Sequence, residues 1–456
     1  MKIFLKSFVA FCAVCVLYLG YSTYKLKNPK PQPLTVQEKT TFETVLSRYE
    51  EPLISPLFWS TEKAGIEKIG IHAASGILID IKTGSILYEK NADRIIPPAS
   101  MTKLAVMYTV FQDIAAGKFS LDDIVPLKSD SWAINAPAGS SLMFLGEGQK
   151  VSLRELLLGL AVVSGNDAAI AVADYIAGSQ NVFIERMNAE TEKLGLKHTR
   201  FVDSSGYSED NTTTAREFAA FARAYLELYP ESLREFHSVK EFRYPENAPT
   251  VHKNTNPALG IIEGVNGLKT GFIPESGYNL ALTAERGSLS ILSVTLGGPG
   301  KGTKQGNEYR LEDSRILTSY AFDNFQSVSV ECARPIPLGV ACGTKNSLFV
   351  REAVPVLKKA QTGDKTTQSQ EDRAEIVLTL PASAIELKRS FVFKNENCLR
   401  APIKAGDIVG KAVFKADGFT VKEIPLVADR DIDEAGFIKK VFDKIACKII
   451  NLQIQQ

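Results

Sequence analysis

The sequence predicts an α/β (α+β) domain, followed by a small β-rich domain and a C-terminal amphipathic helix. Residues 75–89 alternate apolar and polar side chains around a Lys-Thr-Gly turn, which is the pattern of a β-hairpin. Helical stretches follow Ser100 and span 153–176, and strand-like runs return at 278–284 and 289–296. Because strands lie at both ends of a helical block, we expect a sheet whose outer strands come from distant sequence.

Length and composition exclude several classes of protein. A chain of 456 residues with 45% hydrophobic side chains predicts two or three folded units with buried cores. The net charge of +1 supplies no overall field for nucleic acid, so no nucleic-acid partner is predicted. The histidines are scattered, so we predict no metal and no cofactor and expect each of them to be an ordinary surface or turn residue. They are His72, His198, His237 and His252.

The N-terminal segment, residues 1–28, is predicted to be a signal peptide or signal anchor. Two lysines precede an uncharged apolar run at 7–24, which is the pattern of an export signal. Gly20 and Ser22 are small residues at the minus-three and minus-one positions of a possible cleavage after Ser22. The run is also nearly long enough to span a bilayer uncleaved. We therefore predict export and leave cleavage open.

The pattern changes after residue 326, where short β-like runs alternate with turns. We predict an α/β domain at 71–326 and a β-rich domain at 327–432, with a polar loop at 358–373. The segment 29–70 is an N-terminal extension to which no function is assigned. Four cysteines are compatible with disulfides in an oxidising compartment, but the sequence does not determine their pairing. They are Cys332, Cys342, Cys398 and Cys447.

The last segment, residues 433–456, is predicted to be a basic amphipathic helix. Apolar residues recur at helical spacing from Phe437 to Leu452, with four lysines among them. Such a helix suits a membrane surface. The alternative is a terminal helix that packs on the β-rich domain.

Three short motifs occur in order along the chain, and they are Ser100-Met101-Thr102-Lys103, Ser164-Gly165-Asn166 and Lys269-Thr270-Gly271. Together they resemble the active-site set of penicillin-recognising serine enzymes. Each motif alone is weak, because similar strings occur at 22–25, 60–63, 82–84 and 179–181. The order and the surrounding pattern separate the three motifs from these other strings.

The first motif predicts a nucleophile and its base. Ser100 precedes an apolar helical face, so free N–H groups and the helix dipole at the helix start would favour a developing oxyanion. Lys103 lies nearly one helical turn further on, within reach of the Ser100 hydroxyl. A buried lysine can lose its proton near neutral pH and act as a general base. Ser100 and Lys103 are therefore the predicted catalytic pair.

The other two motifs predict the remainder of the site. The Ser164 hydroxyl could relay a proton to the leaving amine, and the Asn166 amide could hold a substrate peptide group. Lys269 and Thr270 supply a charge and a hydroxyl for a terminal carboxylate. Gly271 lets a strand backbone approach a bound peptide closely. The alternatives are a satisfied buried turn for the second motif and a plain turn for the third.

From about residue 73 onward the chain resembles the D-alanyl-D-alanine carboxypeptidases of the low-molecular-mass penicillin-binding proteins. Besides the three motifs, the resemblance includes Asn91-Ala92-Asp93, Ser205-Gly206-Tyr207 and Gly277-Tyr278-Asn279-Leu280. It implies a transpeptidase/β-lactamase-like domain with an antiparallel sheet flanked by helices, and a β-rich stalk. It also implies a location in the periplasm or on the outer face of the cytoplasmic membrane.

The resemblance implies a reaction and further site residues. Ser100 would be acylated by the penultimate D-alanine carbonyl of peptidoglycan stem peptides, and β-lactam antibiotics would acylate the same serine. The backbone N–H groups of Ser100 and Phe272 would form the oxyanion hole. Phe272 stands where relatives carry histidine, and Arg310 matches the carboxylate-binding arginine of the family.

Other functions stay open at this point. A D,D-endopeptidase that cuts cross-linked peptidoglycan would carry the same motifs. A class A β-lactamase is disfavoured because no Glu-x-x-Leu-Asn string lies between Asn166 and Lys269. A non-catalytic wall-binding protein is also disfavoured, since it would have no chemical reason to keep all three motifs.

Overall fold

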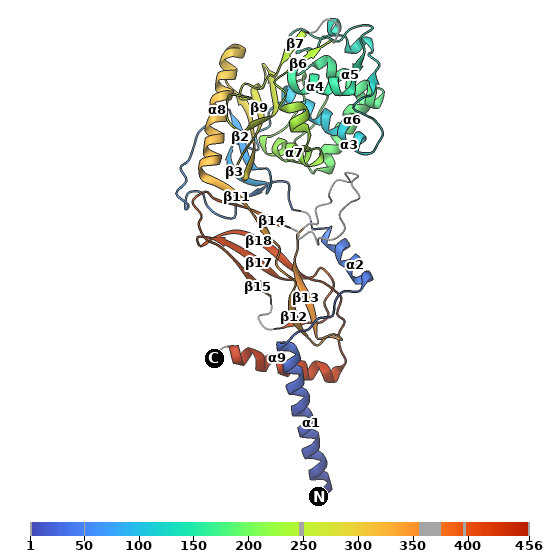
Figure 1. Ribbon diagram of the computed structural model, residues 1–456, viewed down its shortest axis with the longest axis vertical. Coiled ribbons are helices and arrows are strands. Elements are labelled where there is room, and N and C mark those ends of the chain that lie inside the picture. The colour runs from blue at the N-terminus through green and yellow to red at the C-terminus, as the bar shows by residue number, and fades with distance from the viewer. Residues whose placement is uncertain (1, 50, 246–249, 355–374, 395–397, 455–456) are drawn as a thin grey trace. The chain divides into compact units, whose positions relative to one another are not determined.

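The computed structural model describes residues 2–49, 51–245, 250–354, 375–394 and 398–454, which fall into two compact units (Figure 1). One unit comprises 52–327 and 379–383, and the other comprises 1–51, 328–378 and 384–456. The predicted N-terminal extension, 29–70, is therefore divided between the units, with 52–70 in the α/β unit and 29–51 in the β-rich unit. The predicted polar loop at 358–373 lies outside the described residues.

A six-stranded sheet forms the centre of the α/β unit. Its strand order is β1-β3-β2-β10-β9-β8, and every pairing except the parallel one between β1 and β3 is antiparallel. Ile77 lies opposite Val294, so strands from the two ends of the domain are direct neighbours. The predicted hairpin and the joining of distant strands are confirmed. The strands are β1 (Ser55–Pro56), β2 (Ser75–Asp80), β3 (Ser85–Lys90), β8 (Val265–Ile273), β9 (Gly277–Arg286) and β10 (Leu289–Gly298).

Helices cover both faces of this sheet. Helix α8 (Gly302–Asn324) lies along one face, and α7 (Ala215–Leu228) packs on the other (Figure 1). The predicted apolar face after Ser100 is buried in α3 (Lys103–Ala115), where Leu104, Met107 and Phe111 enter the main core. The remaining helices are α4 (Leu153–Leu158), α5 (Asn166–Ala177) and α6 (Gln180–Lys193).

Short elements connect these helices and strands. They are the one-turn helices η1 (Ala99–Thr102), η2 (Ser129–Ser131), η3 (Ala133–Asn135), η4 (Gly159–Val163) and η5 (Leu233–His237), and the strand pairs β4 (Ile124–Val125) with β5 (Val151–Ser152) and β6 (Glu241–Tyr244) with β7 (Thr250–Lys253). The predicted helical stretch 153–176 is therefore divided into α4, η4 and α5, because η4 ends at Val163 and α5 begins only at Asn166.

Two histidines are not the surface or turn residues that the sequence predicted. His237 is fully buried, with its Nε2 2.6 Å from the Tyr225 hydroxyl and its Nδ1 3.0 Å from the Leu268 carbonyl oxygen. His252 is buried with its ring stacked on that of Phe242. The prediction was wrong at both positions because neither hydrogen-bonding partners nor aromatic neighbours are visible from sequence spacing.

The β-rich unit is built on a second six-stranded sheet, in the order β15-β17-β18-β13-β12-β16. This sheet confirms the predicted β-rich C-terminal domain. Its strands are β12 (Ile336–Ala341), β13 (Ser347–Glu352), β15 (Leu387–Phe393), β16 (Leu399–Arg400), β17 (Ile408–Ala416) and β18 (Phe419–Ala428). A separate strand pair, β11 (Phe325–Glu331) with β14 (Glu375–Pro381), contains residues assigned to both units.

Three helices belong to the same unit: α1 (Lys2–Lys27), α2 (Val36–Leu46) and α9 (Phe437–Ile454). Thr35 and Glu38 cap α2 reciprocally in a capping box, which explains where this helix begins. Phe42 and Leu46 of α2 form a small core with residues of the sheet. The extension without assigned function thus contributes a packed helix to the β-rich unit.

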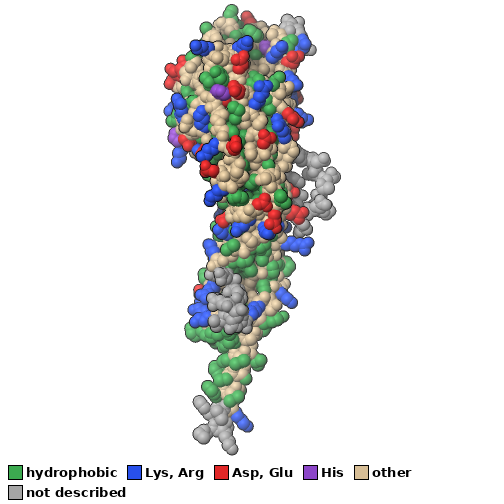
Figure 2. All heavy atoms as spheres, turned by 90° about the vertical axis from the view of Figure 1, so that its left-hand side faces the viewer, with side chains coloured by type: hydrophobic (Ala, Val, Ile, Leu, Met, Phe, Trp, Pro, Cys, Tyr) green, Lys and Arg blue, Asp and Glu red, His purple; other side chains and the backbone are tan. Residues whose placement is uncertain are grey.

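The predicted C-terminal helix is confirmed as α9. A disulfide joins Cys447 of α9 to Cys398, whereas Cys332 and Cys342 are unpaired. Figure 1 shows α9 lying across one end of α1, most of which projects away from the sheet. In Figure 2 hydrophobic side chains cover this projecting part of α1.

Candidate active site

The three predicted motifs meet in one cluster of hydrogen bonds. Ser100 lies in η1 immediately before α3, Ser164 lies between η4 and α5, and Lys269 lies in β8. The Lys103 amine is 2.9 Å from the Ser100 hydroxyl and 2.8 Å from the Asn166 side-chain oxygen. The Lys269 amine donates to the Ser164 hydroxyl over 2.8 Å. Each predicted hydroxyl therefore has a lysine amine within hydrogen-bond distance.

Two residues of this cluster hold a strained backbone. Ala99, just before the candidate nucleophile, has φ of 51°, and Ser164 has φ of 63°. A left-handed conformation costs a non-glycine residue about 1–2 kcal/mol. Such strain persists only where the surrounding packing holds it, and it concentrates at functional sites. Ser100 thus lies in a one-turn helix that leads directly into α3, which agrees with the helix start predicted from the sequence.

Lys103 is completely enclosed by protein. Its side chain has 0% exposure, and its amine also donates to the Ser205 carbonyl oxygen over 2.5 Å. Burial lowers the pKa of Lys103 to about 7, although the carboxylates of Asp203 and Asp167 act in the opposite direction. A large fraction of this amine is therefore neutral near neutral pH, as a general base requires.

A loop that the sequence linked to no role supplies the third partner of Lys103. The Asp203 carboxylate accepts hydrogen bonds from the backbone N–H groups of Ser205, Gly206 and Ser208, at 2.7, 2.5 and 2.7 Å. This turn fixes the Ser205 carbonyl against the Lys103 amine. An aspartate followed by serine and glycine is a turn signal, but it does not reveal what the turn contacts.

Lys269 forms the second buried amine of the site. Its amine also contacts the Thr270 carbonyl oxygen at 2.9 Å, and the Thr270 hydroxyl lies 2.6 Å from that of Thr255. Burial lowers the pKa of Lys269 well below its usual range, and the neighbouring cations Lys103 and Arg310 lower it further. The paired amines are thus electrostatically coupled across the site.

The third motif is packed directly against the turn that carries the candidate nucleophile. A Cβ at Gly271 would lie 2.4 Å from the Pro98 carbonyl oxygen, so only glycine fits there. The Arg310 guanidinium donates to the Gly271 carbonyl oxygen and, over 2.8 Å, to Asn307. Burial lowers the pKa of Arg310 to about 10. The structure therefore brings Arg310, which the resemblance predicted to bind a carboxylate, to the strand that carries the third motif.

Phe272 lies at the outer edge of this strand. Its side chain is 46% exposed and stacks on the ring of Tyr278, with 4.4 Å between the ring centroids. The Arg310 guanidinium also lies 5.0 Å from the centroid of the Tyr278 ring, at cation–π distance. Phe272 is thus packed against Tyr278, although nearly half of its side chain is exposed.

Several supporting residues were missed by sequence reasoning. The buried Asp167 carboxylate accepts from the N–H groups of Met143 and Leu145, and Ser140 accepts from the Asn166 amide over 3.1 Å. These bonds hold a distant loop against the second motif. No spacing pattern connects 140–145 with 164–167, so the sequence carries no signal for this contact.

The similar strings elsewhere in the chain have structural roles. Ser60 accepts a hydrogen bond from the Lys63 N–H group in a turn. The Lys-Thr-Gly at 82–84 lies in the turn between β2 and β3, and Ser179 caps the N-terminus of α6. These placements separate them from the clustered motifs.

The amino-acid sequence also matches known proteins over most of its length. Residues 61–300 match a family model described as D-alanyl-D-alanine carboxypeptidase, and 344–434 match the penicillin-binding protein 5 C-terminal domain. The D-alanyl-D-alanine carboxypeptidase DacC of Escherichia coli is 33% identical over 87% of this chain and 93% of its own length. The chain belongs to the D-alanyl-D-alanine carboxypeptidase family. The activity of this serine-type hydrolase is removal of a terminal D-alanine.

Solved structures support the assignment of this carboxypeptidase. Penicillin-binding protein 5 from Haemophilus influenzae has a TM-score of 0.69 and 29% identity, and the match covers 81% of this chain and 100% of the solved chain. Penicillin-binding protein D2 from Listeria monocytogenes, solved in a cefotaxime-bound form, has a TM-score of 0.50 and 28% identity over 56% of this chain and 99% of the solved one. The predicted catalytic fold and β-rich C-terminal domain are confirmed.

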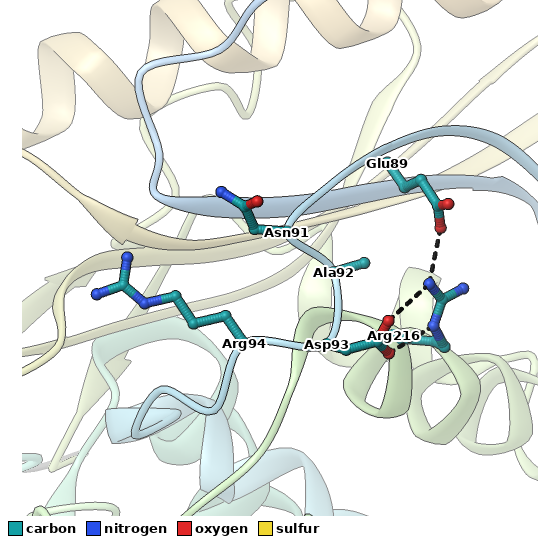
Figure 3. Close-up of a pocket in the computed structure, with 6 residues that line it drawn as sticks. All are labelled: Glu89, Asn91, Ala92, Asp93, Arg94 and Arg216. Carbon is teal, nitrogen blue, oxygen red and sulfur yellow. Dashed lines mark hydrogen bonds and ion pairs between the residues drawn. The ribbon is translucent and has the colours of Figure 1, made fainter.

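In this carboxypeptidase a network of ion pairs fastens the loop that leads to Ser100. Figure 3 shows Arg216 of α7 reaching both Asp93 and Glu89, with distances of 2.7 and 2.8 Å, while Arg94 points away from them. The Arg216 N–H group also donates to the Ala92 carbonyl oxygen. These residues line a hollow of about 520 Å³. The Arg216 guanidinium is already paired with two carboxylates, so we do not expect it to bind a ligand. We infer instead that these ion pairs hold the loop before Ser100 in place.

Replacing Gly206 by alanine should lower the acylation rate of the carboxypeptidase by about 100-fold, since misplacing reacting groups by about 1 Å has effects of this size. The added Cβ would lie 2.0 Å from the Ala99 carbonyl oxygen and 2.9 Å from the Ser100 nitrogen. The nucleophile turn must therefore shift. The measurement is the second-order rate constant of labelling by a fluorescent penicillin.

Gly195→Ala is the matched control for this prediction. Gly195 has φ of 74° and Gly206 has φ of 77°, but a Cβ at Gly195 would meet no atom within 4 Å. Both variants thus carry the same backbone strain, and only one clashes with the site. Equal rates in the two variants would contradict the argument.

Proposed function

We propose that this chain removes the terminal D-alanine from peptidoglycan pentapeptides through an acyl-enzyme on Ser100. The observation that carries the proposal is the Lys103 amine, which is fully buried and 2.9 Å from the Ser100 hydroxyl. Its pKa of about 7 lets the neutral form accept the hydroxyl proton at working pH. The site thus supplies an activated nucleophile.

In the first half-reaction, Ser100 attacks the carbonyl carbon of the penultimate D-alanine while Lys103 takes its proton. The negative charge that develops on the carbonyl oxygen is stabilised by the backbone N–H groups of Ser100 and Phe272. The Ser164 hydroxyl, held 2.8 Å from the Lys269 amine, then passes its proton to the departing nitrogen and receives in return the proton that Lys103 took from Ser100, so that Lys103 becomes neutral again. D-alanine leaves, and an ester remains on Ser100.

The substrate is held by polar groups on both sides of Ser100. Its terminal carboxylate is bound by Lys269, Thr270 and Arg310, which together present two cationic groups and a hydroxyl. Asn166 holds a peptide amide, and the backbone at Gly271 and Phe272 pairs with the extended peptide. Water then attacks the ester, and the free Ser100 hydroxyl is regenerated.

The same site accounts for acylation by β-lactam antibiotics. Their ring amide presents a carbonyl to Ser100, and their carboxylate takes the place of the terminal carboxylate of the substrate. Phe272, stacked on Tyr278, covers one edge of the site and would influence how readily water reaches the ester. The residue at position 272 would therefore influence the rate at which water hydrolyses the β-lactam ester on Ser100.

The substrate places the enzyme outside the cytoplasm, in the periplasm or on the outer face of the cytoplasmic membrane. The first helix supports export, since Lys6–Lys27 is long and apolar enough to cross a membrane. The exposed apolar side chains of α9 support contact with the membrane surface.

Mapping of the penicillin-labelled residue tests the proposal directly. The protein is incubated with a fluorescent penicillin and digested, and the labelled peptide is sequenced by mass spectrometry. We expect the label on Ser100, together with release of D-alanine from a pentapeptide. A label on any other residue would reject the nucleophile, and cleavage confined to cross-linked dimers would show an endopeptidase instead.

A further inference from the structure

The C-terminal part of α1 is packed into the β-rich unit. Ser22 and Leu26 are buried on one face of the helix, and Leu19 is partly buried on the same face. These residues contact α9 and β12, where Leu26 joins a small core with Ala446 and Ile450. The ring of Tyr18 meets that of Phe442 at 4.8 Å. The last turns of α1 thus behave as part of a folded domain.

A buried carboxylate connects the two helices. Asp443 of α9 is 2% exposed and accepts a hydrogen bond from the Ser22 hydroxyl over 2.5 Å. It also accepts from the Cys342 N–H group and the Lys439 amine, at 2.7 and 2.6 Å. A buried carboxylate is stable only when such donors surround it. Ser22 therefore completes the hydrogen bonding of Asp443.

The backbone of α1 also approaches the sheet closely. A Cβ at Gly339 of β12 would lie 2.4 Å from the Leu26 carbonyl oxygen, so only glycine allows this contact. Cleavage after Ser22, the position that suits an export signal, would remove Leu19 and Ser22 from this interface. Cleavage there would therefore leave Asp443 with one donor fewer and expose core side chains of α9.

The other part of α1 is exposed and apolar. Phe8, Phe11 and Leu17 are 58%, 65% and 73% exposed. The uncharged run 7–24 has 18 residues. At about 1.5 Å per residue this is roughly 27 Å of helix, close to the ~30 Å hydrocarbon thickness of a bilayer. Because residues 18–24 of this run belong to the docked part of α1, the span includes the level at which α9 crosses the helix. Lys25 and Lys27 end the run at the docked end.

Helix α9 presents a matching apolar face. Asp443, Ala446, Cys447 and Ile450 are buried, whereas Phe437, Ile438, Val441 and Ile445 are exposed on the opposite side. Lys444 and Lys448 are exposed beside this second face. Apolar residues flanked by lysines suit the boundary between acyl chains and anionic headgroups.

We infer that α1 is retained in the mature protein as a membrane-spanning anchor, and that α9 lies on the same membrane as its docking platform. Figure 1 shows α9 crossing α1 where the projecting part begins, and Figure 2 shows the apolar surface of that part. A spanning helix and a surface helix thus form one module. The occupant of the exposed apolar surfaces is the lipid bilayer.

The mass of the intact protein purified from membranes tests retention. We expect a mass that includes residues 1–22. A protein that begins at Thr23 would overturn the inference, and this outcome is independent of the catalytic proposal because penicillin labelling is measured on the same sample.

A matched pair of substitutions tests the docking of α1 on α9. Leu19→Ala removes a side chain from the interface, whereas Leu17→Ala removes an exposed side chain two residues away. We expect Leu19→Ala to speed hydrogen exchange of the α9 amides in detergent and Leu17→Ala to leave it unchanged. Equal exchange in both variants and the wild type would overturn the docking.

Reconstitution of the protein into lipid vesicles tests whether a bilayer covers the exposed apolar surface of α1. The purified full chain is incorporated into vesicles of phosphatidylethanolamine and phosphatidylglycerol and washed with alkaline carbonate. We expect it to stay with the vesicles, and we expect the same of a Phe437→Glu, Ile438→Glu variant, since α1 alone resists extraction. Release of the wild type would overturn the spanning assignment and indicate a protein partner for the apolar surface.

Discussion

Ser100→Ala should abolish covalent labelling by penicillin and lower D-alanine release by about 10⁴-fold or more, as loss of a catalytic serine nucleophile does elsewhere. Alanine has no atom that can form the ester, and the remaining oxyanion and carboxylate contacts bind substrate without an acyl intermediate. Folding should be unaffected, because the Ser100 hydroxyl has one described partner, the Lys103 amine. The measurements are gel fluorescence and D-alanine release from a pentapeptide.

Ser60→Ala is the control for this substitution, since Ser60 heads another Ser-x-x-Lys string. Among the described residues its hydroxyl has one hydrogen-bond partner, the Lys63 N–H group, so labelling should equal that of the wild type. Labelling that persists in Ser100→Ala would reject the assignment. Loss of labelling in Ser60→Ala would show that the turn at 60–63 supports the site.

The sequence revealed the polar centre of the site because its residues come in short, ordered motifs. Lys103 follows Ser100 by three residues, so its reach could be inferred from helix geometry. The distance between side chains three residues apart is set by helix geometry and does not depend on the rest of the fold. A lowered pKa was likewise predicted for Lys103 as a buried lysine, and burial is its main cause in the structure.

Contacts between distant segments could not be inferred in this way. The Ser205 carbonyl on Lys103, the Leu268 carbonyl on His237 and the Asn166 amide on Ser140 each join residues at least 26 positions apart. Such pairs depend on how strands and loops are arranged in space. Every residue type has a backbone carbonyl, so the sequence does not indicate which carbonyl will accept a hydrogen bond from a given side chain.

The termini show the same limit at a larger scale. The apolar run of α1 and the amphipathic pattern of α9 were each recognised separately. Their contact through Ser22 and Asp443 joins residues 421 positions apart. An export signal and a docked anchor share one composition, so only the packed face of α1 distinguishes between them.

Lys103→Ala should lower the acylation rate by at least about 10³-fold, because the Ser100 hydroxyl loses its base. Lys103→Arg should be comparably inactive, since a guanidinium stays protonated at neutral pH and cannot accept the hydroxyl proton. The measurement is the rate constant of penicillin labelling for each variant at pH 7.5. An active arginine variant would contradict a base role and indicate that positive charge alone is needed.

The dependence of the wild-type rate on pH completes this prediction. Burial lowers the pKa of Lys103 to about 7, so the amine is charged below that pH and neutral above it. The labelling rate should therefore fall as the pH drops through about 7, and the residual activity of Lys103→Ala should lack this inflection.

The dependence of folding stability on pH gives an independent check, because an unfolded lysine binds its proton up to a pKa of about 10.4. Between pH 7 and 10 the unfolded chain holds more protons, so Lys103 makes the folded state more stable as pH rises. Lys103→Ala should reduce that rise, and an unchanged pH dependence of both rate and stability would show that Lys103 does not titrate as the buried site requires.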